Sequence, residues 1–357
     1  MIIERTATVD RRNGRWRGTV RAARALRDRA LVCPFNRAYH VVGVIVLETT
    51  RPVVAVARQV RICDPAIARW AEQTSRDQLA LRGPGGYARL RGSREQLANL
   101  VLLVDSLNFC FWGPAPRYEA EGIACRGFAA MLAAFVDAAR REPRWADARF
   151  WCEVSSAELR RALSPSGDLP MLDEREQIVR QTGRTLIDRF DGQFAAAVES
   201  VNGRAWDVAA LLLVSFDSFR DVAQYDGQPV FFAKRAQIAA LDLSLTWTEH
   251  GHEPLIELER LTAFADYRLP QILRHLGIIE VDAELADTIE NEREIPAGSM
   301  SEVELRAATI IAVERMSQAL AARGINAPPW QIDCHLWDRS HDPSVRIAHH
   351  RTRTIYY

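Results

Sequence analysis

The sequence predicts a mainly α-helical protein with small β-hairpins inserted between the helices. Apolar residues recur at helical spacing along most of the chain, and the longest such stretch is Met300–Arg323. The β signals are short and lie around turns such as Glu121-Gly122. At 357 residues the chain exceeds the size at which one core usually suffices, although a single large domain is still possible.

Composition narrows the class of protein. Hydrophobic residues make up 48% of the chain, which is enough for a sizeable core. Lys plus Arg equals Asp plus Glu at 46 each. A general nucleic-acid-binding surface normally needs an excess of positive charge, so we expect no stable nucleic-acid partner.

Targeting and metal signals are absent from the sequence. The six cysteines form no CxxC pair and show no zinc-ligand spacing with the eight histidines, so no metal and no disulfide framework is expected. Arg5 and Asp10 interrupt any secretory leader, and no apolar run approaches the roughly 20 residues needed to cross a bilayer. We therefore expect a soluble cytoplasmic protein with reduced thiols and no membrane contact.

The first part of the chain contains an arginine-rich stretch, two expected strands and an expected helix start. Residues 1–40 are rich in arginine, and they are either a basic arm or solvated sequence outside the fold. Residues 41–48 and 52–60 are rich in β-branched residues and predict two strands. Asp64-Pro65 then predicts a helix start with Asp64 as the N-cap.

In the middle of the chain, capping boxes and turn signals mark the ends of the expected helices and strands. Ser93 with Gln96 opens a helix that runs into the aromatic segment Asp105–Trp112, where Asn108 is part of either a core ladder or a pocket wall. The elements expected after it are a hairpin at 117–126, helices at 127–141, 155–164 and 173–190, a buried stretch at 206–214, and a turn at 225–228.

Two helix starts carry charges whose role stays open. Lys234 and Arg235 precede a helical pattern and either hold a phosphate or form an ordinary surface. Ser301 and Glu304 predict the capping box of the longest helix.

The stretch Leu261–Gly277 places an acid, an aromatic ring and a base at the entry to a helix that Gly277 ends. Asp266, Tyr267 and Arg268 form either a binding corner or a plain helix cap with a ring packed under it. Near the C-terminus, Asp333 and Asp338 bracket Trp337, and this pair of acids is either catalytic or solvated.

Seven segments stand out in the chain: VDSLNFCFW at 104–112, SFDSFRDV at 215–222, FAKRAQI at 232–238, FADYRLPQILRHLG at 264–277, EVELRA at 302–307, IDCHLWD at 332–338 and RTRTIYY at 351–357. Taken together, in order and spacing, they resemble one family, the queuosine 5′-phosphate N-glycosylase/hydrolases of queuosine salvage. The resemblance covers residue 61 to the C-terminus. It suggests a domain at 61–357 and an N-terminal extension at 1–60.

The resemblance implies a helical fold similar to the helix-hairpin-helix DNA glycosylases. It also implies hydrolysis of the N-glycosidic bond of queuosine 5′-monophosphate, with release of queuine and without a metal or organic cofactor. By position, Phe264, Ala265 and Asp266 resemble base-pocket residues. Asp333 resembles the catalytic residue, and Trp337 and Asp338 resemble the rest of the site.

One position departs from the family pattern. Some relatives carry a histidine about twenty residues before the LNFxFW motif, whereas this region reads Pro84-Gly85-Gly86-Tyr87 here. Either Tyr87 substitutes for that histidine or the contact is absent.

The chemistry of the reaction suggests a role for each residue. Cleavage develops positive charge on the ribose, which a carboxylate such as Asp333 can stabilise. A 7-deaza base has no N7 to protonate, so Asp266 would instead accept from its N–H donors, and Phe264 and Trp337 would stack on it.

The hydroxyls of queuine could reach Asp338, and Lys234, Arg235 and Arg220 are candidates for the 5′-phosphate. The alternative is a non-catalytic queuine- or nucleotide-binding protein.

Overall fold

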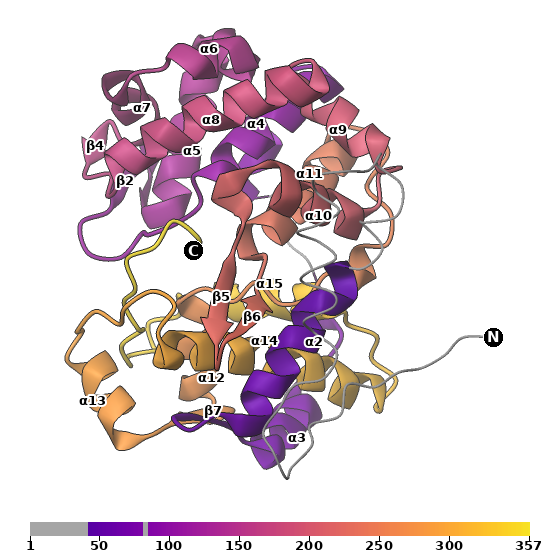
Figure 1. Ribbon diagram of the computed structural model, residues 1–357, viewed down its shortest axis with the longest axis vertical. Coiled ribbons are helices and arrows are strands. Elements are labelled where there is room, and N and C mark those ends of the chain that lie inside the picture. Colours follow the sequence, from indigo (N-terminus) through magenta and orange to yellow (C-terminus); the bar gives the residue numbers. More distant parts are fainter. Residues whose placement is uncertain (1–41, 81–84) are drawn as a thin grey trace. The chain divides into compact units, whose positions relative to one another are not determined.

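The computed structural model describes residues 42–80 and 85–357, which divide into two compact units that interleave along the chain (Figure 1). Within the described residues, the first unit consists of 42–79, 222–232 and 265–350. The second consists of 80–221, apart from the gap at 81–84, with 233–264 and 351–357. Both units are built mainly from helices with small antiparallel sheets, so the predicted fold class is confirmed.

Helix α14 (Met300–Ala321) forms the centre of the first unit, and most of its residues as far as Val313 are buried. The other helices of this unit are α2 (Val42–Val56), α3 (Asp64–Gln73), α12 (Arg268–His275), α13 (Ala283–Glu290) and α15 (Pro329–Arg339). Of these, α2, α3, α12 and α15 contact α14 directly. Two antiparallel pairs complete the unit, β1 (Val60–Ile62) with β7 (Ile279–Val281) and β5 (Val222–Tyr225) with β6 (Gln228–Phe231).

Helix α2 replaces the two strands predicted at 41–48 and 52–60, and that prediction was wrong. The hydroxyls of Thr49 and Thr50 bond back to the carbonyls of Ile45 and Val46, as β-branched threonines do inside helices. The four residues and Val53 are buried at helical spacing. Burial against α14 therefore outweighs the β preference of the single residues. The actual β1 begins only at Val60.

Helix α14 begins at Met300, as predicted, but its N-cap lies two residues before Ser301, so the predicted capping box of Ser301 and Glu304 was wrong. Its N-cap is Ser299, whose hydroxyl accepts from Glu302 N, and Glu302 Oε2 accepts from Gly298 N. Ser301 instead donates to the side chain of Gln59. In the same way, α3 is capped by Cys63 rather than by Asp64, which is its first helical residue.

Helices of the second unit pack around α4 (Arg94–Ser106), whose last ten residues are all buried. The remaining helices are α5 (Gly127–Arg141), α6 (Ala148–Glu153), α7 (Ser156–Leu163), α8 (Leu172–Phe190), α9 (Phe194–Ser200), α10 (Ala205–Ser215) and α11 (Lys234–Glu249). The sheet has the order β3-β2-β4 and comprises β2 (Pro116–Ala120), β3 (Ile123–Arg126) and β4 (Ser166–Gly167).

Several local predictions in this unit are confirmed. Ser93 and Gln96 form a complete capping box, and so do Ser155 and Glu158. The β2–β3 hairpin turns through Glu121 and Gly122, which both have positive φ, as a tight primed turn requires. In the first unit, Asp226 and Gly227 do the same between β5 and β6.

Two further sequence predictions concern the N-terminal extension and membrane-spanning helices. Residues 1–41 lie outside the described residues, so the expected N-terminal extension and its boundary at residue 60 stay predictions. Among the described residues, none of the helices combines the length and the apolar content that crossing a bilayer requires.

Candidate functional site

The predicted helix entry at Asp266 is present in the first unit, and it is built as a cap. Asp266 is buried, and its Oδ1 accepts from Arg268 N at 2.7 Å and Leu269 N at 2.9 Å at the start of α12. These are two of the backbone donors that a helix start leaves unpaired. Gly277 ends the helix with a φ of +67°. The structure therefore confirms the capping role of Asp266, and this role fixes the direction of its carboxylate.

Hydrogen bonds and a ring contact also hold the residues near Asp266 in place. Arg306, a buried residue of α14, donates its Nε to the carbonyl of Ala265 at 3.0 Å. The ring of Tyr267 lies against that of His349, with 4.7 Å between the ring centroids. Gln271 donates to the carbonyl of Ile347 at 2.6 Å. The segment is thus tied to α14 and to residues 347–349, so its backbone is rigid.

Helix α15 carries the second group of predicted site residues. Asp333 is buried, with 4% of its surface exposed, whereas Trp337 is half-buried and Asp338 is exposed. The Trp337 ring packs against that of His341, with 4.4 Å between centroids. Desolvation lowers the pKa of His341, while the negative charges of Asp266 and Asp338 act in the opposite direction. Asp266 and Asp338 therefore both lie within electrostatic range of His341, although they are far apart in the sequence.

The remaining predicted residues belong to the second unit. Phe264 is buried there. Arg220 is exposed and forms an ion pair with Asp217 at 2.8 Å. Lys234 is buried at the start of α11, where its backbone N–H donates to Asp221 Oδ2 at 3.1 Å and its ammonium donates to the carbonyl of Asn108 at 3.3 Å.

Arg235 does not fit the predicted phosphate contact. It is 1% exposed, and its two terminal nitrogens donate to the carbonyls of Ser106 and Ser218. Burial lowers the pKa of its guanidinium to about 10. Both nitrogens are thus committed to holding the fold, so the geometry favours a structural role over phosphate binding.

The aromatic segment that ends at Trp112 is a core segment held together by buried cations. Arg175 on α8 donates to the carbonyls of Leu107 and Phe109, each at 2.6 Å, and lies over the Phe109 ring at 4.1 Å. The C-terminal residues of the same unit complete the enclosure. The Cys110 N–H donates to the Tyr357 carbonyl, and the Trp112 indole donates to the Thr352 carbonyl. These contacts favour the core-ladder interpretation and link two of the motifs, FCFW and RTRTIYY.

A pair of carboxyl groups that the sequence did not single out, the buried Asp105 and the half-buried Asp242, lies beside this segment. Tyr87 donates its hydroxyl to Asp105 Oδ1 at 3.0 Å and also bonds with Asp242 on α11. Tyr87 and Asp105 are buried, and Asp105 Oδ2 has no hydrogen-bond partner among the described residues. Tyr87 therefore holds two acids.

The two acids cannot both ionise easily. Desolvation raises the pKa of Asp105 to about 7, against partial compensation by the Tyr87 hydrogen bond and the positive charges of Lys234 and Arg235. Desolvation and the neighbouring Asp105 charge raise the pKa of Asp242 well above its ordinary value. Each carboxyl group therefore disfavours ionisation of the other. The sequence feature that could have indicated this pair is the acid Asp242 between Leu241 and Leu243 in an apolar helix.

In the described part of the chain, no group of three or more His, Cys, Asp or Glu side chains is placed to hold a metal ion. In the first unit the candidate residues are two buried acids, Asp266 and Asp333, the half-buried Trp337 and the exposed Asp338.

Comparison with known proteins agrees with these motifs. Residues 89–357 match the family model described as queuosine salvage protein. A queuosine 5′-phosphate N-glycosylase/hydrolase of Sphaerobacter thermophilus is 40% identical over 314 residues, which is 87% of this chain and 97% of that protein. Proteins with the same name from Dictyostelium discoideum and Mus musculus are 37% and 32% identical, and cover 74% and 85% of this chain and 79% and 92% of their own lengths. The chain therefore belongs to the queuosine salvage protein family.

Proposed function

We propose that this protein hydrolyses the N-glycosidic bond of queuosine 5′-monophosphate and releases the base queuine for salvage. The observation that carries the proposal is the 40% identity, over nearly the full length, to a relative named queuosine 5′-phosphate N-glycosylase/hydrolase. Asp266, Asp333 and Asp338, the acids that the reaction would use, are all present in the first unit. The protein is thus an enzyme that acts on an N-glycosyl compound.

Asp333 is the carboxylate that we propose for the chemical step. As the bond breaks, the ribose gains positive charge, and a carboxylate in a low-dielectric setting stabilises that charge more strongly than one in water. Asp333 is 4% exposed on α15, whereas Asp338 on the same helix is exposed. The burial of Asp333 therefore supports the electrostatic role, and the exposure of Asp338 supports an outer contact with the diol of queuine.

Asp266 is the acid that we propose for recognition of the base. Its Oδ1 is occupied by two backbone N–H groups, while Oδ2 accepts no hydrogen bond from the described residues. A carboxylate locked in this way presents one oxygen in a fixed direction, which suits an N–H donor on the pyrimidine edge of a 7-deazapurine. Because such a base lacks N7, recognition along that edge replaces protonation at N7.

The other substrate contacts are proposed residue by residue from the family resemblance. Phe264 and Trp337 would stack on the base, with the backbone at Ala265 held by Arg306. Lys234 is our candidate for the 5′-phosphate, since it is a buried cation and Arg235 is committed to carbonyl groups. Arg220 is a weaker candidate because it is exposed and paired with Asp217.

Substitution of Asp333 by Asn tests the chemical role. We expect Asp333→Asn to fold and to lose most of its turnover, by about a hundredfold or more, because the charge is removed while the shape is kept. The measurement is chromatographic detection of free queuine after incubation with queuosine 5′-phosphate. Asp287→Asn, on the exposed face of α13, is the control and should retain wild-type turnover.

The same assay separates the enzyme from a protein that only binds queuine. Wild-type protein that binds the substrate without releasing queuine would contradict the proposed reaction. An Asp333→Asn variant with full turnover would contradict only the assignment of this residue. Comparing the nucleotide with the nucleoside in Lys234→Ala tests the phosphate contact, since loss of that contact should affect only the nucleotide.

Three further expectations are proposals that rest on the sequence and the resemblance. These are a fold similar to helix-hairpin-helix DNA glycosylases, a catalytic domain that begins near residue 61, and a cytoplasmic location without a stable nucleic-acid partner. A truncated protein that starts at residue 61 tests the boundary, and fractionation of cells tests the location.

A further inference from the structure

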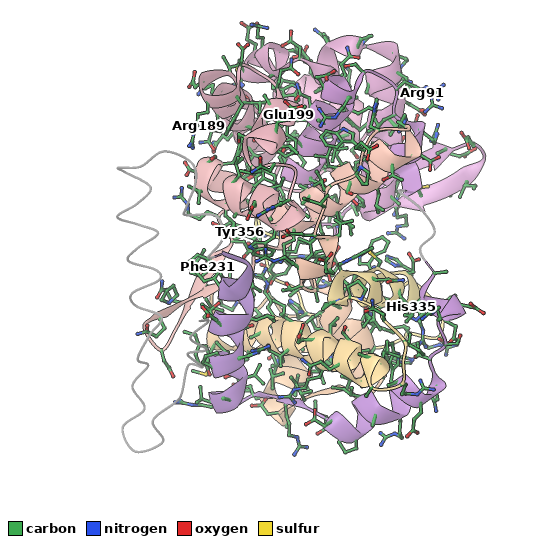
Figure 2. All side chains as sticks on the ribbon, turned by 90° about the vertical axis from the view of Figure 1, so that its right-hand side faces the viewer. Arg91, Arg189, Glu199, Phe231, His335 and Tyr356 are labelled. Atoms are coloured by element: carbon green, nitrogen blue, oxygen red, sulfur yellow. The ribbon has the colours of Figure 1, made fainter. Side chains whose placement is uncertain are left out.

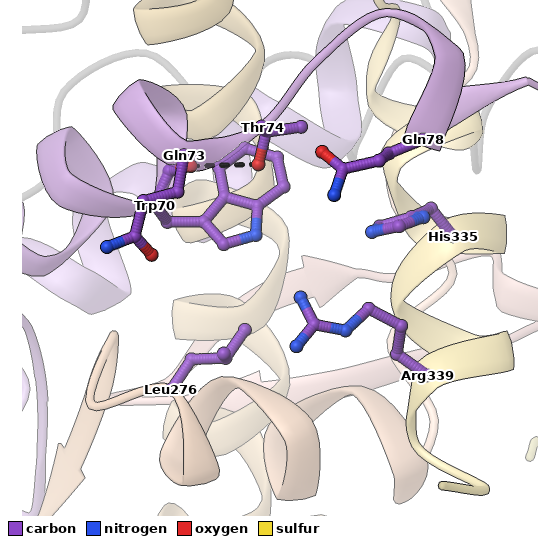
Figure 3. A pocket seen from close by; sticks show the side chains of 7 residues that line it. All are labelled: Trp70, Gln73, Thr74, Gln78, Leu276, His335 and Arg339. Carbon is purple, nitrogen blue, oxygen red and sulfur yellow. Dashed lines mark hydrogen bonds between the residues drawn. The ribbon is translucent and has the colours of Figure 1, made fainter.

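A separate pocket of about 430 Å³ lies within the first unit (Figure 3). Its walls come from the end of α3, the short turn η2 (Asp77–Leu79), the end of α12 and one side of α15. The seven lining residues are Trp70, Gln73, Thr74, Gln78, Leu276, His335 and Arg339. A volume of this size suits a small metabolite rather than a single water molecule.

The pocket lies on the side of α15 that faces away from Asp333, the residue proposed for the chemical step. Successive residues of an α-helix are rotated by about 100°, so His335 and Arg339 point about 200–240° away from Asp333. Both side chains line the pocket, and Figure 2 shows His335 on the same helix. A ligand here would therefore touch α15 without occupying the site of the reaction.

The polar groups that face the pocket are mainly hydrogen-bond donors. Trp70 is 6% exposed, and its indole N–H is buried without a partner among the described residues. Figure 3 shows this nitrogen facing the same space as the Arg339 guanidinium. Gln78 Oε1 accepts from Ser75 N at 2.8 Å, which leaves its NH₂ group turned toward His335 and Arg339.

No negative charge opposes these donors within the pocket. None of the seven lining residues is acidic. Arg339 is exposed and makes no ion pair within the described part of the chain. An N–H that is buried without a partner costs free energy, so an acceptor supplied by a ligand would be favoured there. The lining thus suits an oxyanion.

The walls of the pocket are held in place by hydrogen bonds across them. Gln331 on α15 donates to the carbonyl of Leu79 at 2.8 Å, which fixes η2 against α15. Arg323 donates to the carbonyls of Ala71 and Thr74 at the end of α3. The elements that carry the donors are therefore fixed relative to one another before any ligand arrives, which lowers the entropy cost of binding.

We propose that this pocket is a second binding site for a small organic oxyanion, a carboxylate or a phosphate ester. Arg339 would hold the charge, and Trp70 and Gln78 would complete its hydrogen bonds. The proposal goes beyond the hydrolysis of queuosine 5′-phosphate, because it concerns a different face of α15 and a ligand that is not consumed.

The test follows the indole N–H signal of Trp70 by NMR in the full-length protein, with inorganic phosphate and malonate as separate probes. Trp70→Phe identifies the signal by its disappearance. We expect the signal to shift on titration with one or both probes. Arg339→Gln should weaken that binding by about tenfold or more, since a charge-assisted hydrogen bond is lost. A shift with phosphate alone indicates a phosphate ester, and a shift with malonate indicates a carboxylate.

Arg69→Gln is the matched control, because Arg69 is an exposed arginine on α3 outside the pocket lining. It should bind the probes as the wild type does. An unmoved Trp70 signal with both probes, or equal binding by Arg339→Gln and wild type, would overturn the proposal. Turnover of queuosine 5′-phosphate by Arg339→Gln should stay near the wild-type value, so failure of the pocket and failure of the proposed function can be told apart.

Discussion

Two fully buried carboxylates, Glu304 in the first unit and Asp105 in the second, have opposite surroundings. Glu304 on α14 accepts the N–H groups of Arg58, Gln59 and Val60 at 2.8–3.2 Å and the Tyr225 hydroxyl at 2.7 Å. Donors therefore fill its hydrogen-bonding capacity, and Glu304 joins the start of β1 to the central helix.

Asp105 has one strong donor and a like-charged neighbour. Tyr87 supplies the donor, Asp242 supplies the neighbour, and Oδ2 makes no hydrogen bond to the described residues. Burial therefore acts against its charge and raises its pKa to about 7. The comparison shows that burial alone does not define the surroundings of a carboxylate, because the number of donors that face it differs between the two sites.

The largest predicted effect is on Glu304. Glu304→Ala leaves three backbone N–H groups and the Tyr225 hydroxyl without their acceptor, and each unmet donor costs about 1–3 kcal/mol. We expect the free energy of unfolding to fall by at least about 4 kcal/mol, measured by urea denaturation. Glu284→Ala, at an exposed position of α13, is the control and should change it little. A small loss in Glu304→Ala would mean that water replaces the carboxylate.

The next effect is a pH dependence that arises from Asp105. Its pKa rises from 3.8 when unfolded to about 7 when folded. Between about pH 4 and pH 7 the folded state then holds a proton that the unfolded state has lost, so this group reduces stability as the pH rises. Asp105→Asn removes that group. The free energy of unfolding of the variant, relative to that of the wild type, should therefore be about 3 kcal/mol higher at pH 8 than at pH 4.

Urea denaturation at the two pH values measures this gain. Asp188→Asn, an exposed acid on α8, should follow the pH dependence of the wild type. If Asp105→Asn also follows the wild type, Asp105 is ionised in the folded state.

The same comparison explains how far the sequence alone could predict this protein. Turns and caps depend on residues within four positions of each other, so Ser93 with Gln96 and the turn at Glu121-Gly122 were predictable. For Asp266 the helix cap was one of the two interpretations that the sequence left open. Glu304 was misassigned, because its true partners lie 244–246 residues away and leave no local pattern.

The carboxyl pair was missed for the same reason. Asp105 and Asp242 are 137 positions apart in number, and only the packing of α4 against α11 brings them to one tyrosine. The two strands predicted from the β-branched residues of α2 were wrong for another reason, since burial against α14 outweighed the strand preference of these residues. Family motifs, in contrast, pointed to Asp266 and Asp333 without any knowledge of contacts, because whole segments match.

The smallest predicted effect separates the two candidate caps of α14, and it tests whether Glu304 is free to act as the anchor described above. Ser299→Ala removes the hydroxyl that accepts from Glu302 N and should cost about 1 kcal/mol of unfolding free energy. Ser301→Ala removes only a half-buried bond to Gln59 and should cost about half as much or less. Urea denaturation of both variants gives the comparison.

A larger loss of unfolding free energy in Ser301→Ala than in Ser299→Ala would place the cap at Ser301 with Glu304 as its partner. In that case Glu304 could not hold the start of β1, because one carboxylate cannot serve both its own helix start and three N–H groups of another segment.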